Sequence, residues 1–338
     1  MRSAVVAGGL LFALATAACH RSTPPDALDD RAFWALSESL SEPAGSFPLS
    51  DNLVSNEPRL AENARWIRRR GGVYIGVGPE QNFTYIARLR PSTAFIVDIR
   101  RENRSLHLLY KALFEISQNR ADFVSRLFSR ARPSGHMSNA RDLFAKFAAQ
   151  PPSEELRLRT LALIRERLVG AHGFPLPQSD LDWIGQALRS FYTNGPDIHF
   201  WSAGPSPPDA VRPSYRQLMT ALDLSGQERS FLSEDGAFAF VKDLHARNKI
   251  VPVIGDFGGP AAIRAIGRTV REHGDAVQAF YASNVAVYLT NRQMAAFCAS
   301  LATLPAASGA WFIESDAVRS FHSKLVNCQP GPILQWRR

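Results

Sequence analysis

The sequence lacks the motifs that usually hold metals. Its three cysteines and eight histidines are dispersed over 338 residues, with no C-x-x-C, H-x-x-x-H or H-E-x-x-H spacing, so we expect no metal site. The G-x-S-x-G turn of a serine nucleophile and the G-K-[ST] triplet of a phosphate loop are also missing. These absences argue against zinc enzymes, serine hydrolases and P-loop phosphoryl transfer.

No apolar run near the start is long enough for an ordinary membrane span. The run 4–14 follows one arginine and precedes the small residues "ATAAC", a layout typical of a secretory signal peptide over 1–19. "TAAC" resembles a bacterial lipobox, in which Cys19 becomes the lipidated first residue, although Thr16 stands where leucine is usual. We therefore expect an exported protein, periplasmic or an outer-membrane lipoprotein. If Met1 is not the true start, the same chain is cytoplasmic.

Two cysteines remain when Cys19 is set aside. An oxidising compartment can join Cys298 to Cys328, but two buried free thiols fit the sequence equally well. The sequence leaves both alternatives open.

Positive charge is in modest excess. Lys and Arg number 39 against 31 Asp and Glu, a net charge of +8, yet the arginines are scattered along expected helices instead of forming a tail. A solvated surface explains this pattern. We expect no nucleic-acid partner, and contact with a membrane only through the lipid anchor.

The chain divides into a tether and a folded body. Residues 20–56 are rich in Pro, Ser, Asp and Glu and hold one short apolar segment, which predicts a tether with a small helix that docks on the body. The body starts with 57–130 and continues through a helical insertion at 131–248, which we expect to lie over the sheet. It ends with 249–338, including a closing hairpin from "FHSKLVN" to "ILQW".

Strands and amphipathic helices alternate in the body. Strands are expected at "VYIGV", "TAFIVDI", "KIVPVI", "AVQAFYASNV" and "GAWFIES". Such near-continuous apolar runs suit parallel strands that are covered on both faces. Five strands with helical crossovers predict an α/β fold with a doubly wound, mostly parallel, Rossmann-like sheet.

The first strand leads into the glycine turn "GVGPEQN", Gly76 to Asn82. Ligands of open α/β sheets lie at the carboxyl ends of the strands, and Gly76 and Gly78 would let a ligand approach the backbone closely. Asn82 stands where a third small residue is usual, and Pro79 has no N–H to donate. A pyrophosphate cradle is therefore disfavoured.

Two aspartates end neighbouring strands. Asp98 comes 20 residues after Gly78 and is placed to accept hydrogen bonds from ribose hydroxyls. Asp256 ends the next strand, within reach of an adenine amino group if the strand order is 3-2-1-4-5. Singly, each of these residues has a plain role as turn former or helix cap; together they predict a site for a small nucleoside-like ligand.

With these residues in place, the chain resembles the class I S-adenosylmethionine-dependent methyltransferase fold. It resembles more closely a group of bacterial proteins that share the runs "VGPEQNFTYIA", "FIVDIRR", "LLYKALFE", "VPVIGDFGGP" and "FYASNVAVYL". The resemblance covers 57–314 and implies S-adenosylmethionine as the cofactor. The cofactor contacts expected from the turn and the resemblance are Gly76, Gly78, Glu80, Asn82, Asp98, Ile99, Asp256, Phe257 and Ser283.

The fourth strand of many such enzymes ends in a motif that positions the acceptor. Here "YASNVAVYL" supplies Ser283, Asn284 and Tyr288 without the usual prolines, which puts amino or base methylation in doubt. The long segment "YTNGPDIHFW" carries Tyr192 and His199, which either belong to a functional lid or are ordinary core or surface side chains.

The run "IRRENRSLHLLYK" clusters basic residues just past the second strand. It is read either as a solvated helix face or, at Arg100 and Arg101, as a site for an anionic substrate.

Two functions from different classes follow. The sheet predicts a methyltransferase-like enzyme with an unknown acceptor, for which His199, Tyr192 and Asn284 are catalytic candidates and Arg100 and Tyr288 substrate contacts. The leader predicts instead an exported lipoprotein that uses a degenerate sheet of this type as a non-catalytic binding or scaffold module. The two conflict, because an exported protein leaves the compartment in which that cofactor is made.

Overall fold

The computed structural model describes residues 26–47, 51–201 and 212–328. The expected signal peptide, Cys19 and the "ILQW" segment lie outside these ranges. Among the helices of the described chain, none is both long and apolar enough to cross a bilayer.

A six-stranded mixed sheet forms the centre of the molecule, in the strand order β3-β2-β1-β4-β5-β6. The strands are β1 (Val73–Gly76), β2 (Thr93–Asp98), β3 (Ile250–Ile254), β4 (Val277–Ser283), β5 (Ala306–Glu314) and β6 (Val318–Ser320). Neighbours among β1 to β5 are parallel, and β6 is antiparallel to β5. The chain is an α/β protein with a mostly parallel sheet, compatible with a Rossmann-like fold. The strand order assumed for Asp256 is confirmed.

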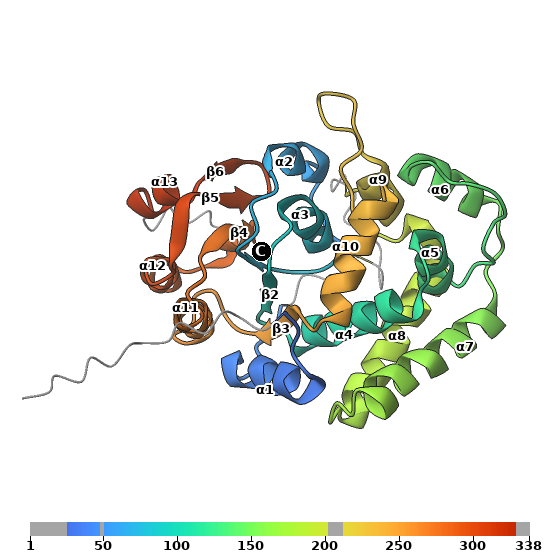
Figure 1. Cartoon of the computed structure of the whole chain (residues 1–338), viewed down its shortest axis with the longest axis horizontal. Coiled ribbons are helices and arrows are strands. Elements are labelled where there is room, and N and C mark those ends of the chain that lie inside the picture. The colour runs from blue at the N-terminus through green and yellow to red at the C-terminus, as the bar shows by residue number, and fades with distance from the viewer. Residues whose placement is uncertain (1–25, 48–50, 202–211, 329–338) are drawn as a thin grey trace, which may run out of the picture.

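The strands are apolar because helices cover them. Every residue of β1 and β3 is buried, as expected for parallel strands. Helices α3, α4 and α10 pack on one another and on the strands, and α11 packs with α12. Figure 1 shows these two groups on either side of the sheet.

Helices connect and flank the strands. Those of the described chain are α1 (Asp30–Leu40), α2 (Leu60–Trp66), α3 (Gln81–Leu89), α4 (Arg101–Ile116), α5 (Arg120–Phe128), α6 (Ala140–Ala148), α7 (Glu154–Arg165), η1 (Glu166–Ala171), α8 (Gln178–Asn194), η2 (Gly195–Asp197), α9 (Tyr215–Thr220), α10 (Asp235–Ala246), α11 (Ala262–Glu272), η3 (Val285–Tyr288), α12 (Asn291–Leu301) and α13 (Phe321–Val326).

The helical lobe, α5 to α9, lies beside the sheet. Helices α5, α7 and α8 pack against α4 and extend to the right of it in Figure 1. Because α4 is buried along nearly its whole length, one of its sides covers the sheet and another receives the lobe. The insertion at 131–248 was expected to lie over the sheet. Its larger part, α6 to α9, instead belongs to this lobe, whereas its last helix, α10, packs on α3 and α4.

The closing hairpin is placed differently from the prediction. β6 supplies the antiparallel strand, and "FHSKLVN" begins the helix α13 instead of a strand. The Ser320 side chain accepts a hydrogen bond from the Ser323 N–H and so caps this helix. Phe321 is buried, and Leu325 packs against the core one turn later, which is a helical spacing.

A disulfide joins Cys298 of α12 to Cys328, with an S–S distance of 2.06 Å and a Cα–Cα distance of 5.6 Å. Of the two alternatives that the sequence left open, the structure has the bonded one. The bridge fastens the segment after α13 to the body.

In the N-terminal segment the predicted small helix that docks on the body is confirmed as α1, but the rest of the segment differs from a tether. α1 buries Phe33 and Leu40 and packs on β3, where the Ser37 hydroxyl donates to the Pro252 carbonyl at 2.5 Å. Further along, Leu53 and Val54 are 3% and 0% exposed. Because these apolar side chains are buried, the segment packs as part of the body.

Candidate functional site

The glycine turn lies at the carboxyl edge of the sheet, where the strand order places a ligand site. Gly78 has φ +77°, a conformation that favours glycine. At Gly76 an added Cβ would collide with the side chains of Asn82 and Tyr74. The space above Gly76 is therefore occupied by the protein itself.

Asn82 holds the turn together. Its amide nitrogen donates to the carbonyls of Val77, Gly78 and Pro79 at 3.0, 3.0 and 2.7 Å. Its amide oxygen accepts from the Tyr74 hydroxyl at 2.8 Å. The asparagine that stands where a small residue is usual therefore joins the turn to the start of α3 and to β1.

Glu80 is fully buried in the same turn. Both of its carboxylate oxygens lie 3.2 Å from the backbone nitrogen of Ser55, which donates to them. Burial raises the pKa of Glu80 to about 8, because a charged carboxylate is disfavoured away from water. At neutral pH this side chain is therefore mostly protonated.

Asp98 ends β2 as predicted, but Arg100 encloses its carboxylate. Nε and Nη2 of Arg100 donate to the two oxygens at 3.1 and 3.3 Å, and the Arg100 backbone N–H donates at 3.0 Å. Nη1 of Arg100 donates to the carbonyl of Asp51 at 2.9 Å. The expected ribose partner and the expected substrate residue are thus bonded to each other.

The end of β3 is covered by Glu42. Its N–H donates to the Ile254 carbonyl at 2.8 Å. Its carboxylate accepts from the N–H groups of Asp256, Ala261 and Ala262 at 3.1, 2.6 and 2.8 Å, a favourable place for an anion at the start of α11. Asp256 itself accepts from the Gly258 N–H at 2.8 Å, so it acts as a turn former.

Ile99 and Ser283 meet the same N-terminal segment. The N–H of Gly45 donates to the Ile99 carbonyl at 2.8 Å. The Ser283 hydroxyl at the end of β4 donates to the buried Glu57 carboxylate, whose pKa is raised by burial.

Residues 41–47 and 51–57, which we call the edge strap, therefore contact the carboxyl edge. Their contacts follow the strand order: Ile254 after β3, Ile99 after β2, Glu80 after β1 and Ser283 after β4. In this arrangement the protein's own chain bonds one polar group at each of the four strand ends. Glu57 Oε2, Gln81 Oε1 and His107 Nδ1 at the same edge are buried without a hydrogen-bond partner among the described residues.

Asn284 and Tyr288 flank the far end of the strap. The Asn284 amide lies 3.5 Å from the Tyr288 hydroxyl, and the Tyr288 ring meets the Phe47 ring edge-on at 5.1 Å. Phe257 points elsewhere, because it is buried and stacks on Phe297 at 5.4 Å.

The two candidates from the long loop are not brought to this edge. Tyr192 is on α8 of the helical lobe, where Arg157 lies over its ring at 5.9 Å. His199 follows η2 and is exposed. No described contact joins either residue to the glycine turn or to the strap.

Two residues at the turn were missed by sequence reasoning. His107 of α4 is buried, and its Nε2 lies 2.8 Å from the Gly78 carbonyl; burial lowers its pKa to about 4. Gln81 donates to the Val77 carbonyl at 3.0 Å. The spacing of Arg104, His107 and Lys111 places these three side chains on one face of the helix, and this pattern could have pointed to His107.

That basic face of α4 is buried, so its reading as a solvated face is wrong. Arg104 pairs with Glu38 of α1, and Lys111 pairs with Glu115 at 2.6 Å. Arg101, by contrast, is partly exposed and bonds Asp180 of α8 at 2.7 Å. The face is where α1 docks.

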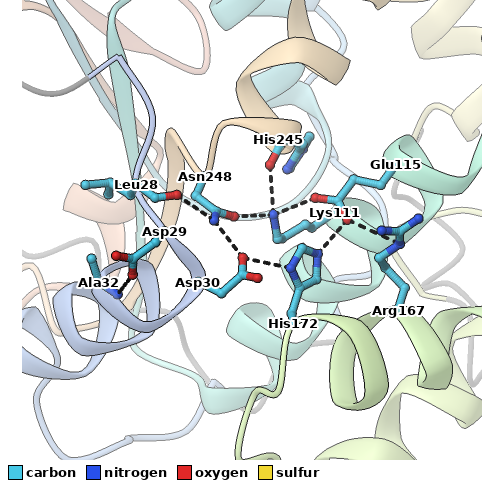
Figure 2. Close-up of polar contacts among 10 residues, drawn as sticks. All are labelled: Leu28, Asp29, Asp30, Ala32, Lys111, Glu115, Arg167, His172, His245 and Asn248. Carbon is cyan, nitrogen blue, oxygen red and sulfur yellow. Dashed lines mark hydrogen bonds and ion pairs between the residues drawn. The ribbon is translucent and has the colours of Figure 1, made fainter.

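A second polar network fixes α1, and Figure 2 shows it. His172 lies between two carboxylates: its Nδ1 is 2.8 Å from Asp30 and its Nε2 is 2.6 Å from Glu115. The Asn248 amide nitrogen donates to Asp30 at 2.9 Å, and Asn248 also accepts from Lys111. The partners come from α1, from α4 and from the segments after η1 and α10. The network therefore holds α1, the helix that precedes the strap, against the body.

A search of the described ranges for three or more His, Cys, Asp or Glu side chains able to hold one ion found no such group.

One comparison with known proteins gives a match. A family model described as a domain of unknown function (DUF7790) matches residues 52–324. Because the match spans well over half of the chain, the chain belongs to this family. No curated protein matches the chain.

Proposed function

We propose that this member of the family is a non-catalytic binding or scaffold module of the cell envelope. In this proposal its doubly wound, methyltransferase-type sheet no longer takes a nucleoside, because the edge strap occupies the ligand edge. The observation that carries the proposal is the succession of strap contacts across four neighbouring strand ends.

The energetics of the edge support this proposal. A nucleoside that used Asp98 and the glycine turn would have to displace Arg100 from Asp98 and Ser55 from Glu80. Leaving a buried donor or acceptor without a partner costs about 1–3 kcal/mol for each group, and more if it is charged. Such a ligand would therefore lose much of its binding energy to opening the edge.

The disulfide supports the exported location that the leader predicts. Bonds such as Cys298–Cys328 form and persist mainly in oxidising compartments. In such a compartment the protein has no supply of S-adenosylmethionine, so a retained methyl transfer would lack its donor.

A methyltransferase that opens its strap is the second candidate. The sheet order with an antiparallel β6, the positive φ of Gly78 and the position of Asp98 at the end of β2 favour it. In-line methyl transfer would then depend on proximity and orientation of the acceptor. Tyr192 or His199 would take a proton only if the helical lobe moved toward the edge.

Isothermal titration of the chain beginning at His20 with S-adenosylmethionine and S-adenosylhomocysteine separates the two candidates. We expect no binding heat. Ser55→Pro removes the N–H that bonds Glu80 and tests whether the strap alone closes the edge. Gly78→Val fills the turn, and its thermal melt shows whether it still folds.

Micromolar binding by the unaltered chain that is lost in a folded Gly78→Val variant would overturn the proposal. Binding by Ser55→Pro alone would reveal an intact nucleoside site beneath the strap and favour the second candidate.

A further inference from the structure

The loop between α9 and α10 projects from the molecule beside α2 (Figure 1). The two elements are joined, because the N–H of Leu224 in this loop donates to the Glu62 carboxylate of α2 at 2.9 Å. Glu62 in turn pairs with Arg65 at 3.5 Å. Side chains from both elements therefore share one surface.

Large apolar side chains are exposed on this surface. Leu224 is 83% exposed, Trp66 51% and Leu222 46%. Leu224 and Leu222 lie in the projecting loop and Trp66 ends α2. Single exposed apolar residues need no explanation, but three on adjoining elements form a patch of the kind that contacts partners.

Arginines flank Trp66 in the sequence, and Arg229 follows the two leucines of the loop. Arg65 lies over the Trp66 ring at 5.4 Å, and Arg68 and Arg69 are exposed. Arg88 adds a further charge: its pKa is lowered by burial and by the nearby guanidinium groups of Arg229 and Arg68. The arginines thus lie close enough to repel one another.

Acidic groups balance only part of this charge. Glu62 pairs with Arg65, and Asp223 accepts from Arg229 at 2.7 Å. Arg68 and Arg69 make no described ion pair, and Arg68 contributes to the repulsion at Arg88. The surface is therefore complementary to an extended anionic partner.

We infer that this arginine–tryptophan surface, formed by Arg65, Trp66, Arg68, Arg69, Leu222, Leu224 and Arg229, rests on an anionic phospholipid bilayer. Tryptophan is enriched at membrane–water interfaces, and arginines near the headgroups are attracted by their negative surface potential. The exposed leucines of the projecting loop enter the boundary between headgroups and acyl chains. A nucleic acid would leave these leucines without a role.

This inference goes beyond the proposed function and does not depend on it. Arg68 and Arg69 precede β1 at its amino end, whereas the edge strap covers the carboxyl ends of the strands. If Cys19 carries a lipid, the contact with the bilayer would be a second membrane attachment. A single acyl chain binds membranes only marginally, so stable anchoring needs such a second attachment.

The test is vesicle flotation of the chain beginning at His20, which carries no acyl group. The vesicles contain phosphatidylcholine alone or mixed with phosphatidylglycerol. We expect binding only to the mixed vesicles and weakening at high salt. The double variant Arg68→Glu/Arg69→Glu should weaken vesicle binding at least about 25-fold, because the loss of each arginine should weaken it about fivefold. Leu224→Ser should weaken it without changing the salt dependence.

The matched control is Arg159→Glu with Arg165→Glu, the same charge change at two exposed positions of α7, which should leave binding unchanged. Equal losses in the two double variants would overturn the inference, because only net charge would matter. Failure to bind mixed vesicles would also overturn it. If the chain instead bound polyglutamate through Arg68 and Arg69, the partner would be an acidic protein.

Discussion

Arg100 and Asp98 form a buried ion pair at the end of β2. The closest approach is 3.1 Å between Nε and Oδ1, and each side chain is 7% exposed. The sequence predicted instead that Asp98 accepts hydrogen bonds from the ribose hydroxyls of a ligand. In the structure Asp98 is the ion-pair partner of the buried Arg100 guanidinium.

Removal of Asp98 should therefore destabilise the fold. Asp98→Ala leaves Arg100 buried and unpaired, and we expect a loss of about 3–5 kcal/mol in the free energy of unfolding. Urea unfolding followed by circular dichroism measures it. Glu155→Ala, which breaks the exposed pair with Arg159, is the control and should cost less than about 1 kcal/mol. Equal costs for the two variants would contradict the buried pair.

The buried Glu80 should make stability depend on pH. Its folded pKa, about 8, is raised above the ordinary value of 4.5, so the folded state holds a proton that the unfolded state releases. The resulting stability is fully present below pH 4.5 and is lost as the pH rises toward 8.

Glu80→Gln cannot ionise. Between pH 4.5 and pH 9 its free energy of unfolding should therefore fall by on the order of 4 kcal/mol less than that of the parent. Urea unfolding at a series of pH values measures the difference between variant and parent. A difference that stays constant with pH would show that Glu80 has an ordinary pKa. Glu155→Gln, at an exposed site, provides the reference.

The His172 network should control the mobility of α1. His172→Ala removes the bridge between Asp30 and Glu115, and we expect faster hydrogen exchange in α1 by about tenfold or more, since each bond to a charged group contributes about 1.5–3 kcal/mol. His136→Ala, at an exposed position, should leave α1 unaffected. Unchanged exchange in His172→Ala would mean that apolar packing of α1 suffices.

The disulfide should stabilise the C-terminal part of the body. Cys298 and Cys328 are 30 residues apart, a loop for which chain entropy gives about 3–4 kcal/mol. Cys328→Ser should lose this amount in urea unfolding, and the parent treated with reductant should match the variant. A parent that is insensitive to reductant, with both thiols open to alkylation, would contradict the bond.

The strands could be predicted from the sequence because the apolar pattern that specifies each one lies within its own few residues. The run "IVPVI" is apolar throughout and "TAFIVD" is apolar between its first and last residues, and the helices between the strands have a clear 3.6-residue period. Asp98 and Asp256 were correctly placed at strand ends because a strand end is also a local feature.

The occupation of the site could not be predicted in this way. Asp51 as a partner of Arg100 and Ser55 as the partner of Glu80 depend on where a distant segment packs. The low hydrophobicity of 20–56 favoured a tether, and the two apolar residues Leu53 and Val54 were too weak a signal to reveal the strap. The burial of Lys111 likewise depends on where α1 packs, because the Lys111 ammonium lies over the Phe33 ring of that helix.

Hydrogen exchange of the edge strap tests the central claim most directly. The N–H groups of Glu42, Gly45 and Ser55 bond to Ile254, Ile99 and Glu80. We predict that these three amides exchange as slowly as those of β1, because opening them requires a large part of the fold to open, and that S-adenosylhomocysteine does not change their exchange. Rapid exchange of these amides, or exchange that changes when the nucleoside is added, would contradict a closed edge.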